Sequence, residues 1–251
     1  MSIADDFSDR LSPSQRAFRY ALTRRVISLG VRCYLRVSPP VGLERLPAAP
    51  FVLCFNHLNW VDPFVLLTVW PAQPRLYVYG PKERDMRRGW RNHLITWTGM
   101  AVPFNPSKTN LLASTKRAVA VLQGGDVLAI AGEGRLSERE DEVMPIHEGP
   151  AFVAIHAGVP IVPLGLNGTR WLRFGKRVRL RIGEPIPTAG KRADRETLRA
   201  TTEELHAALT ELVQGYDDTA VPGPFGRWLT DLFNERPWLA SERPDPPTGM
   251  G

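Results

Sequence analysis

The stretch FNHLNWVDPF, residues 55–64, holds one histidine and one aspartate, separated by four residues. A carboxylate bound to one imidazole nitrogen leaves the other nitrogen able to take a proton, so His57 and Asp62 predict a general base and its orienting partner. The spacing alone is weak evidence, because His206 and Glu211 repeat it within an expected helix, where five residues turn the side chains apart. The pair can therefore do chemistry only across a turn.

The elements around this pair supply such a turn. The apolar run PFVLCF (50–55) predicts a buried strand, and Asp62-Pro63 predicts the start of a helix. An aspartate at this point also favours an N-cap, and an ordinary loop histidine is the alternative for His57. Cys54 lies inside the apolar run, which predicts an inert buried thiol rather than a nucleophile.

Strands and helices alternate along the rest of the chain. Further strands are expected at 75–80, 126–132, 159–166 and 177–186, the last with the alternation of an edge strand, and helices at 107–122, 147–158 and 195–216. This order predicts an α/β fold: a single domain with a mixed, largely parallel sheet flanked by helices, preceded by an N-terminal amphipathic helix. The expected division is an N-terminal basic helical segment (1–40), a domain (41–216) and a proline-rich tail (217–251).

The N-terminal helix is expected over 13–36, opening at Ser12-Pro13. Apolar residues recur at helical spacing and form a stripe along it: Phe18, Leu22, Val26, Leu29 and Cys33. Arginines accompany this stripe, and no acidic residue does. This pattern suits an interfacial membrane helix, and equally a helix packed on the domain with its arginines in solvent.

A short amphipathic helix is expected in the tail at 225–233, with Trp228, Leu229, Leu232 and Phe233 on one face. Docking on the domain, membrane contact and partner contact are all open for it. Residues 241–251 are expected to be disordered.

Composition and charge limit the cellular compartments and the kinds of cofactor that we expect for this protein. The formal charge is +6, which attracts polyanions of any kind, and the two cysteines form no CxxC pair. The acidic N-terminus predicts no signal peptide, and no apolar run reaches the ~20 residues that span a bilayer. We expect a cytoplasmic protein, soluble or lying on the inner face of the cell membrane. No cluster of potential ligands has metal-binding spacing, so no metal and no resident cofactor is expected.

Four ordered blocks carry a resemblance to a known family. They are Asn56 to Asp62 (NHLNWVD), Gly99 to Asn105 (GMAVPFN), Ala131 to Ser137 (AGEGRLS) and Val159 to Pro163 (VPIVP). In order and spacing they resemble the glycerolipid acyltransferases of the lysophosphatidic acid acyltransferase type, over roughly residues 40–190. The family implies acyl transfer from acyl-CoA or acyl-carrier protein to an acceptor hydroxyl, with His57 as base and Asp62 as its orienter.

Two blocks depart from the family pattern. Asn105 stands where the family usually has an arginine associated with the acceptor phosphate, and Lys108 is a nearby substitute. In the third block Ala131 and Gly132 replace Phe and Pro. The resemblance implies 1-acyl-glycerol-3-phosphate, or another lysophospholipid or glycerol phosphate, as acceptor. An acceptor without glycerophosphate and a weakened lipid-binding protein remain alternatives.

The third block supplies further candidate substrate-binding residues. Glu133, Gly134 and Arg135 follow an apolar strand, at whose carboxyl end ligands bind in open α/β sheets. Arg135 is expected on a phosphate, with a surface ion pair to Glu133 as the alternative, and Ser137 completes the block. Glu133 is expected either to hold an acceptor hydroxyl or to order neighbouring loops. No signature of a nucleic-acid fold accompanies the arginines, so lipid or cofactor phosphate is the favoured partner.

Overall fold

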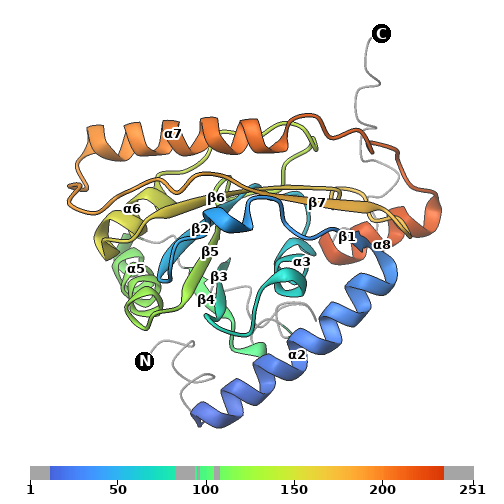
Figure 1. The fold of residues 1–251 in the computed structure, drawn as a ribbon, viewed down its shortest axis with the longest axis horizontal. Helices are drawn as coiled ribbons and strands as arrows, with labels where there is room; N and C mark the ends of the chain where they lie inside the picture. The colour runs from blue at the N-terminus through green and yellow to red at the C-terminus, as the bar shows by residue number, and fades with distance from the viewer. Residues whose placement is uncertain (1–11, 83–93, 95–96, 105–107, 235–251) are drawn as a thin grey trace.

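A seven-stranded sheet forms the centre of the molecule, in the order β1-β7-β6-β2-β5-β3-β4. It is seen in a computed structural model that describes residues 12–82, 94, 97–104 and 108–234 (Figure 1). The strands are β1 (Arg36–Val37), β2 (Phe51–Phe55), β3 (Leu76–Lys82), β4 (Ala101–Phe104), β5 (Val127–Ala131), β6 (Ile161–Asn167) and β7 (Arg177–Ile182). All neighbouring pairs are parallel except β6 and β7, which confirms the predicted mixed, largely parallel sheet.

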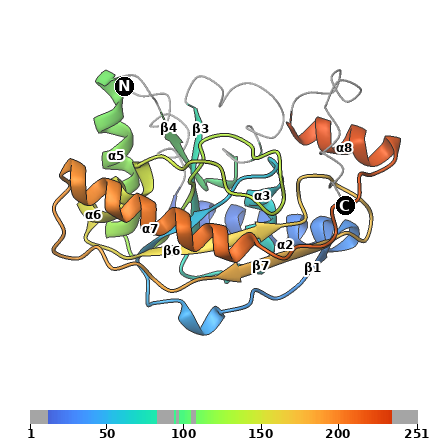
Figure 2. The same cartoon turned by 90° about the horizontal axis from the view of Figure 1, so that it is seen from above.

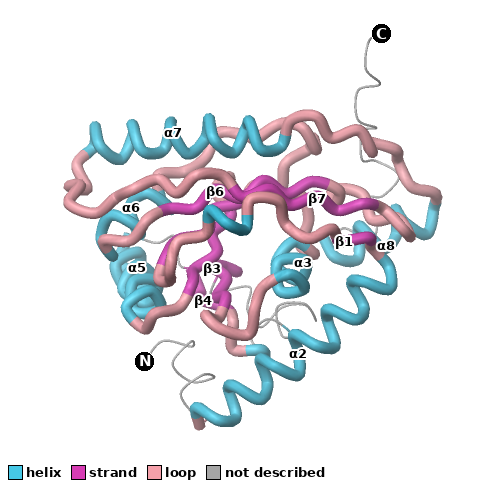
Figure 3. Tube along the Cα trace, viewed as in Figure 1, coloured by secondary structure: helices cyan, strands magenta, loops and turns pink. Residues whose placement is uncertain are grey.

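Helices cover both faces of this sheet (Figure 3). One face packs against α2 (Pro13–Tyr34) and α3 (Asp62–Val69), and the other against α5 (Lys108–Gln123), α6 (Gly149–Ala157) and α7 (Arg195–Val213). A further helix, α8 (Pro224–Asn234), packs on the α2 and α3 side. Strand β2 is buried at all five positions, as expected of a strand covered on both faces.

The sheet differs from the prediction at two strands, one that was missed and one that was misplaced. Strand β4 was not predicted, because it has only four residues and one of them is Pro103, which disfavours a strand. The expected edge strand β7 is not at the edge, since β1 pairs with its start at Arg177 and Val178. The expected helix 13–36 correspondingly ends at Tyr34, and the residues after it become β1.

The N-terminal helix α2 has two apolar faces rather than one. Its predicted cap is confirmed, because Ser12 accepts a hydrogen bond from the Gln15 amide. The predicted stripe points away from the domain, with Phe18 67%, Val26 62% and Leu29 68% exposed. The helix packs instead through other residues, namely Tyr20, Ile27, Val31 and Tyr34. The expected helix and its exposed stripe are thus both present.

Arginines of α2 also contact the domain. Arg24 Nε donates to the Trp70 carbonyl at 2.8 Å and Arg32 donates to the Thr68 carbonyl at 3.3 Å, both at the C-terminal end of α3. Cations are favourable at this end of a helix dipole. None of the helices in the described ranges is long and apolar enough to cross a membrane.

The tail helix α8 docks on the domain, which was one of its three open interpretations. Its buried face is largely polar and includes Thr230 and Asp231, both 0% exposed. The predicted apolar face is therefore only partly right, because Leu229 and Phe233 pack against the core whereas Trp228 stays 48% exposed.

Candidate functional site

The His57 turn, residues 56–62, connects the end of β2 to the start of α3. Parallel pairing of Phe55 with Ala131 brings the end of β2 beside the end of β5. The first and third sequence blocks therefore meet at the carboxyl ends of two adjacent strands, where ligands bind in open α/β sheets.

Within this turn the predicted His–Asp contact is present. His57 Nδ1 lies 2.9 Å from Asp62 Oδ2, with 12% of the His57 side chain exposed and Asp62 fully buried. Because a carboxylate only accepts, Nδ1 is the donor, and Nε2 is the nitrogen left with a lone pair. This is the arrangement expected for a general base with an orienting carboxylate.

The Asp62 carboxylate also shapes the turn itself. Oδ2 accepts hydrogen bonds from the amides of Leu58 at 2.8 Å and Asn59 at 2.9 Å. The prediction that Asp62 caps the following helix is wrong, because its bonds run backward into the turn and Val61 occupies the N-cap position. One oxygen thus fixes both the imidazole and the loop that carries it.

Asn56 extends the β2–β6 pairing by one step. Its Nδ2 donates to the Leu166 carbonyl at 2.8 Å, and its Oδ1 accepts from the Leu166 amide at 2.7 Å. The Asn56 side chain therefore makes the two hydrogen bonds to β6 that the β2 backbone would make if the strand continued. This anchors the His57 turn to β6, the strand that begins within the VPIVP block at Ile161.

Glu133 connects the third block to the same turn. Its Oε2 accepts from the His57 amide at 2.7 Å and its Oε1 from the Met144 amide at 2.8 Å. Burial raises the pKa of the Glu133 carboxyl, and the nearby Asp62 carboxylate raises it further. The two amide donors and His57 act in the opposite direction and lower it. Of its two expected roles, these contacts favour ordering the loops.

The remaining residues of the block lie close by. The Ser137 amide donates to the His57 carbonyl at 2.6 Å, while its hydroxyl bonds the Arg139 and Glu142 carbonyls. Gly134 has φ of 63° and a Cβ there would lie 2.8 Å from His147, so the turn requires glycine. Arg135 follows it and is exposed. Since Glu133 is only 2% exposed, a surface ion pair between it and Arg135 does not describe this site.

The second block is only partly described. Asn105 lies outside the described residues, and Lys108 is the first residue of α5. Their predicted contacts with the acceptor, like those of Arg135 and Ser137, stay predictions. Cys54 is fully buried, and burial raises the pKa of its thiol far above the usual value, which argues against a thiolate nucleophile.

An apolar cavity of about 300 Å³ borders the His57 turn. It lies between α2, α3 and α8. Each of the described residues that line it is apolar or aromatic: Ile27, Gly30, Val31, Tyr34, Leu35, Val61, Phe64, Leu94, Leu172, Leu229 and Phe233. Val61 belongs to the turn and precedes Asp62. The volume falls in the range of small-ligand pockets, roughly 300–1,000 Å³.

Sequence reasoning missed one contact of the turn. The amide of Trp60 donates to Asn234 Oδ1 at 3.1 Å, across a separation of 174 residues. The Trp60 ring lies 6.0 Å from the His57 ring, edge to face. An asparagine at the end of a tail helix carries no spacing signal that could have revealed this contact.

Comparison with known proteins identifies a family and a similar fold. A family model described as "Acyltransferase" matches residues 40–167, slightly more than half of the chain. Among solved structures, the chain resembles the crystal structure of the 1-acyl-sn-glycerophosphate (LPA) acyltransferase PlsC from Thermotoga maritima. The TM-score is 0.57 at 19% sequence identity, and the match covers 81% of each chain. This similarity shows a shared fold.

Proposed function

Because the chain belongs to the acyltransferase family, we propose that it transfers a fatty acyl chain from a thioester to a hydroxyl of a glycerophosphate-type acceptor. The observation that carries the proposal is the His57–Asp62 contact of 2.9 Å at the carboxyl end of β2. The donor is acyl-CoA or acyl-carrier protein, used as a co-substrate, and the most favoured acceptor is 1-acyl-glycerol-3-phosphate.

The reaction needs only one base. His57 Nε2 takes the proton of the acceptor hydroxyl while its oxygen attacks the thioester carbonyl carbon. The carbon–sulfur bond then breaks, and the imidazolium returns its proton to the departing thiolate. Asp62 stabilises the transient imidazolium, as the carboxylate of a catalytic triad does. No covalent acyl-enzyme is required, because a thioester is already activated.

Substrate contacts follow from what lies around the turn. The apolar cavity beside Val61 supports binding of the acyl chain. Arg135, exposed after Gly134, is the proposed partner of a phosphate, which its planar fork binds through two hydrogen bonds. Lys108 at the start of α5 is a second proposed phosphate contact, in place of the arginine that Asn105 replaces.

The test is release of coenzyme A from long-chain acyl-CoA in the presence of a panel of lysophospholipids. We expect wild type to be active and His57→Ala to lose activity by about 10²–10⁴-fold. His156→Ala is the matched control, since His156 is exposed on α6. Equal, slow release by wild type and His57→Ala would instead favour the weakened lipid-binding protein.

Asn105 favours the alternative of an acceptor without glycerophosphate. The same panel, extended with a lyso-aminolipid, is then assayed with Asn105→Arg. A gain on phosphate-bearing acceptors alone supports Asn105 as the residue that decides acceptor choice, and no gain argues against it.

A membrane surface is the proposed partner of α2. Its stripe of Phe18, Val26 and Leu29 is exposed and lies among arginines, which suits an interfacial helix on anionic lipid. The combined change to serine at these positions should weaken flotation with anionic liposomes. Val41→Ser/Leu43→Ser, at two exposed apolar positions between β1 and β2, should not. Substitution is preferable to deletion of the helix, because Tyr20 and Val31 pack in the core. Equal flotation of all variants would contradict the proposal and the peripheral, inner-face location.

A further inference from the structure

Helix α8 contacts the His57 turn from outside the segment that the family model matches. That segment ends at residue 167, whereas α8 begins at Pro224. In Figure 1 α8 lies near the C-terminal end of α2, and Figure 2 shows the two helices set apart at the same end of the molecule. Residues of α2, α3 and α8 line one cavity. Four of its residues reach the domain core or the turn, two through hydrogen bonds and two through apolar contacts.

Polar contacts fix the position of α8. Thr230 Oγ1 accepts from the Leu172 amide at 2.8 Å, and Thr230 is fully buried. Asn234, 8% exposed, accepts from the Trp60 amide at 3.1 Å. A buried amide without a partner is costly, so these bonds hold the helix in one register against the domain.

Apolar side chains of the same helix form part of the cavity wall. Leu229 and Phe233 line the cavity, and the Phe233 ring lies 6.4 Å from that of Phe64 on α3, edge to face. Phe233 immediately precedes Asn234. One turn of α8 therefore forms part of the cavity wall and holds the backbone that follows His57.

We propose that α8 is a specificity-determining element, in which Leu229 and Phe233 limit the length of the acyl chain and Asn234 positions the His57 turn. The proposal rests on the function proposed above. A chain in the cavity presses against the helix whose last residue bonds the turn. The fit of the chain and the geometry of the base are then set by one rigid element, rather than by the matched domain alone.

The first arm of the test measures kcat/KM for a series of acyl-CoA chain lengths. Phe233→Ala and Leu229→Ala enlarge the cavity and should shift the preference toward longer chains, by about tenfold in the ratio of long to short. Leu232→Ala is the matched control, because Leu232 is on the same helix and is not among the residues that line the cavity.

The second arm fills the cavity from the opposite wall. Gly30 lies on α2 in the cavity lining, and a Cβ built there meets no atom within 4 Å. The Cβ of a larger side chain therefore has room, and Gly30→Leu should shift the preference toward shorter chains. This variant keeps the test decisive even where truncation of Phe233 lowers the melting temperature.

The third arm concerns Asn234 as a positioning residue. Asn234→Ala removes the acceptor of the Trp60 amide and should lower kcat severalfold while leaving the chain-length preference unchanged. Asn234→Asp keeps an acceptor oxygen and should restore most of kcat, which loss of packing alone would not explain.

Two results would overturn the proposal. If the chain-length ratio of Phe233→Ala, Leu229→Ala and Gly30→Leu stays within twofold of wild type, α8 does not set specificity. If Asn234→Ala has the kcat of wild type, the helix does not position the turn. Both outcomes leave the proposed function intact as long as wild type is active and His57→Ala is not; an inactive wild type removes both.

Discussion

Two buried carboxylates from one loop have different partners: one binds the turn that carries the candidate base, and the other forms a buried ion pair. Glu133 and Glu140 are seven residues apart, and they are 2% and 4% exposed. Glu133 accepts two backbone amides, those of His57 and Met144, and lies against the His57 turn. Glu140 pairs with Lys176, whose Nζ lies 3.1 Å from Glu140 Oε1 and whose side chain is fully buried.

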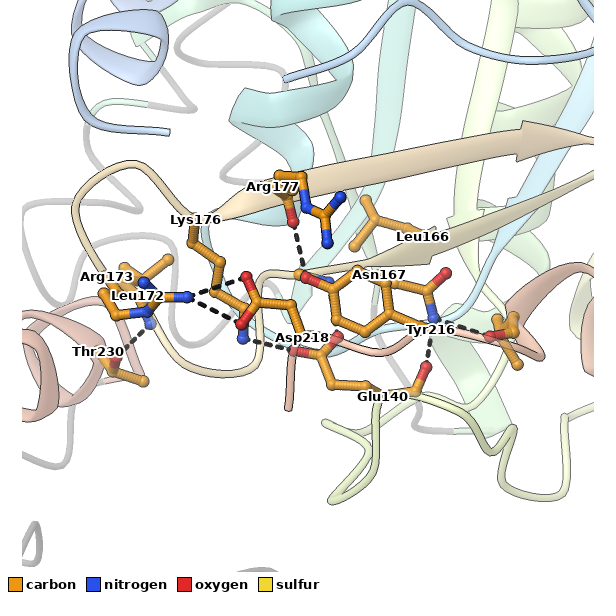
Figure 4. Close-up of polar contacts among 12 residues, drawn as sticks. Glu140, Leu166, Asn167, Leu172, Arg173, Lys176, Arg177, Tyr216, Asp218 and Thr230 are labelled. Carbon is orange, nitrogen blue, oxygen red and sulfur yellow. Dashed lines mark hydrogen bonds and ion pairs between the residues drawn. The ribbon is translucent and has the colours of Figure 1, made fainter. Parts of the chain in front are cut away.

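The second carboxylate belongs to a closed network, shown in Figure 4. Its Oε2 accepts from the Gly168 amide at 2.6 Å, and Asn167 Nδ2 donates to its backbone carbonyl. The Lys176 ammonium also faces the Tyr216 ring, 5.9 Å from its centroid. Burial raises the pKa of Glu140, and Lys176 opposes that rise. This network ties the loop to β6, β7 and the segment after α7.

The difference shows which acid–base pair is suited to catalysis. Buried titratable groups occur both in active sites and in structural ion pairs, so perturbation alone does not separate the two. At the His57 turn the basic side chain remains 12% exposed and has one nitrogen left to accept a proton. In the Glu140 network the ammonium is fully enclosed. We therefore expect the first pair to control rate and the second to control stability.

The largest expected effect is on rate, from Asp62→Asn. An amide at this position removes the charge that stabilises the imidazolium, and kcat for coenzyme A release should fall by about 10²–10⁴-fold. The amide oxygen can still accept from Leu58 and Asn59, so the fold should persist by circular dichroism. A kcat within a few-fold of wild type would contradict the role of Asp62.

The matched change in the network is Lys176→Met, and its effect should be on stability. It leaves Glu140 buried without its partner, which typically costs about 3–5 kcal/mol in the free energy of unfolding. Lys176→Met/Glu140→Gln should recover most of the loss, because glutamine still accepts from the Gly168 amide. Urea denaturation measures both, and a double variant as unstable as the single one would contradict this account.

Stability of Lys176→Met should also depend on pH. A carboxyl whose pKa is raised in the folded state binds more protons there than in the unfolded chain, so stability falls as pH rises. The fall should begin near the ordinary value of 4.5 and continue up to the raised pKa of Glu140. Wild type should show a weaker dependence, since Lys176 opposes the rise. A flat profile for the single variant would show that Glu140 is not left charged and buried.

The sequence predicted the elements that local patterns control. Continuous apolar runs such as FVLCF identify strands covered on both faces, and β2 is buried throughout. The His57–Asp62 pair was predictable because its turn is short and bounded by a strand and a helix. Asp-Pro correctly marked the start of α3, but the same signature suggested a cap that the carboxylate does not form.

Contacts between distant segments could not be predicted in this way. The bond from the His57 amide to Glu133 crosses 76 positions, and the bond from the Trp60 amide to Asn234 crosses 174. Such contacts depend on packing of the finished sheet, and single polar residues leave no periodic signal. The same limit explains α2, where the stripe was found but the second apolar face, which does the packing, was not.

The smallest expected effect comes from Glu133→Gln, which should lower both the rate and the stability. Both Glu133 oxygens accept a backbone amide, whereas glutamine can supply only one such oxygen and directs its NH₂ toward the other amide. One buried N–H then loses its partner, at about 1–3 kcal/mol in the free energy of unfolding. Because one of the two amides is that of His57, kcat should also fall, by less than in Asp62→Asn. Measuring the free energy of unfolding and kcat on the same preparation decides the matter: loss of stability alone would place Glu133 with Glu140 as a structural carboxylate, and loss of both would make it the element through which the loop holds the base.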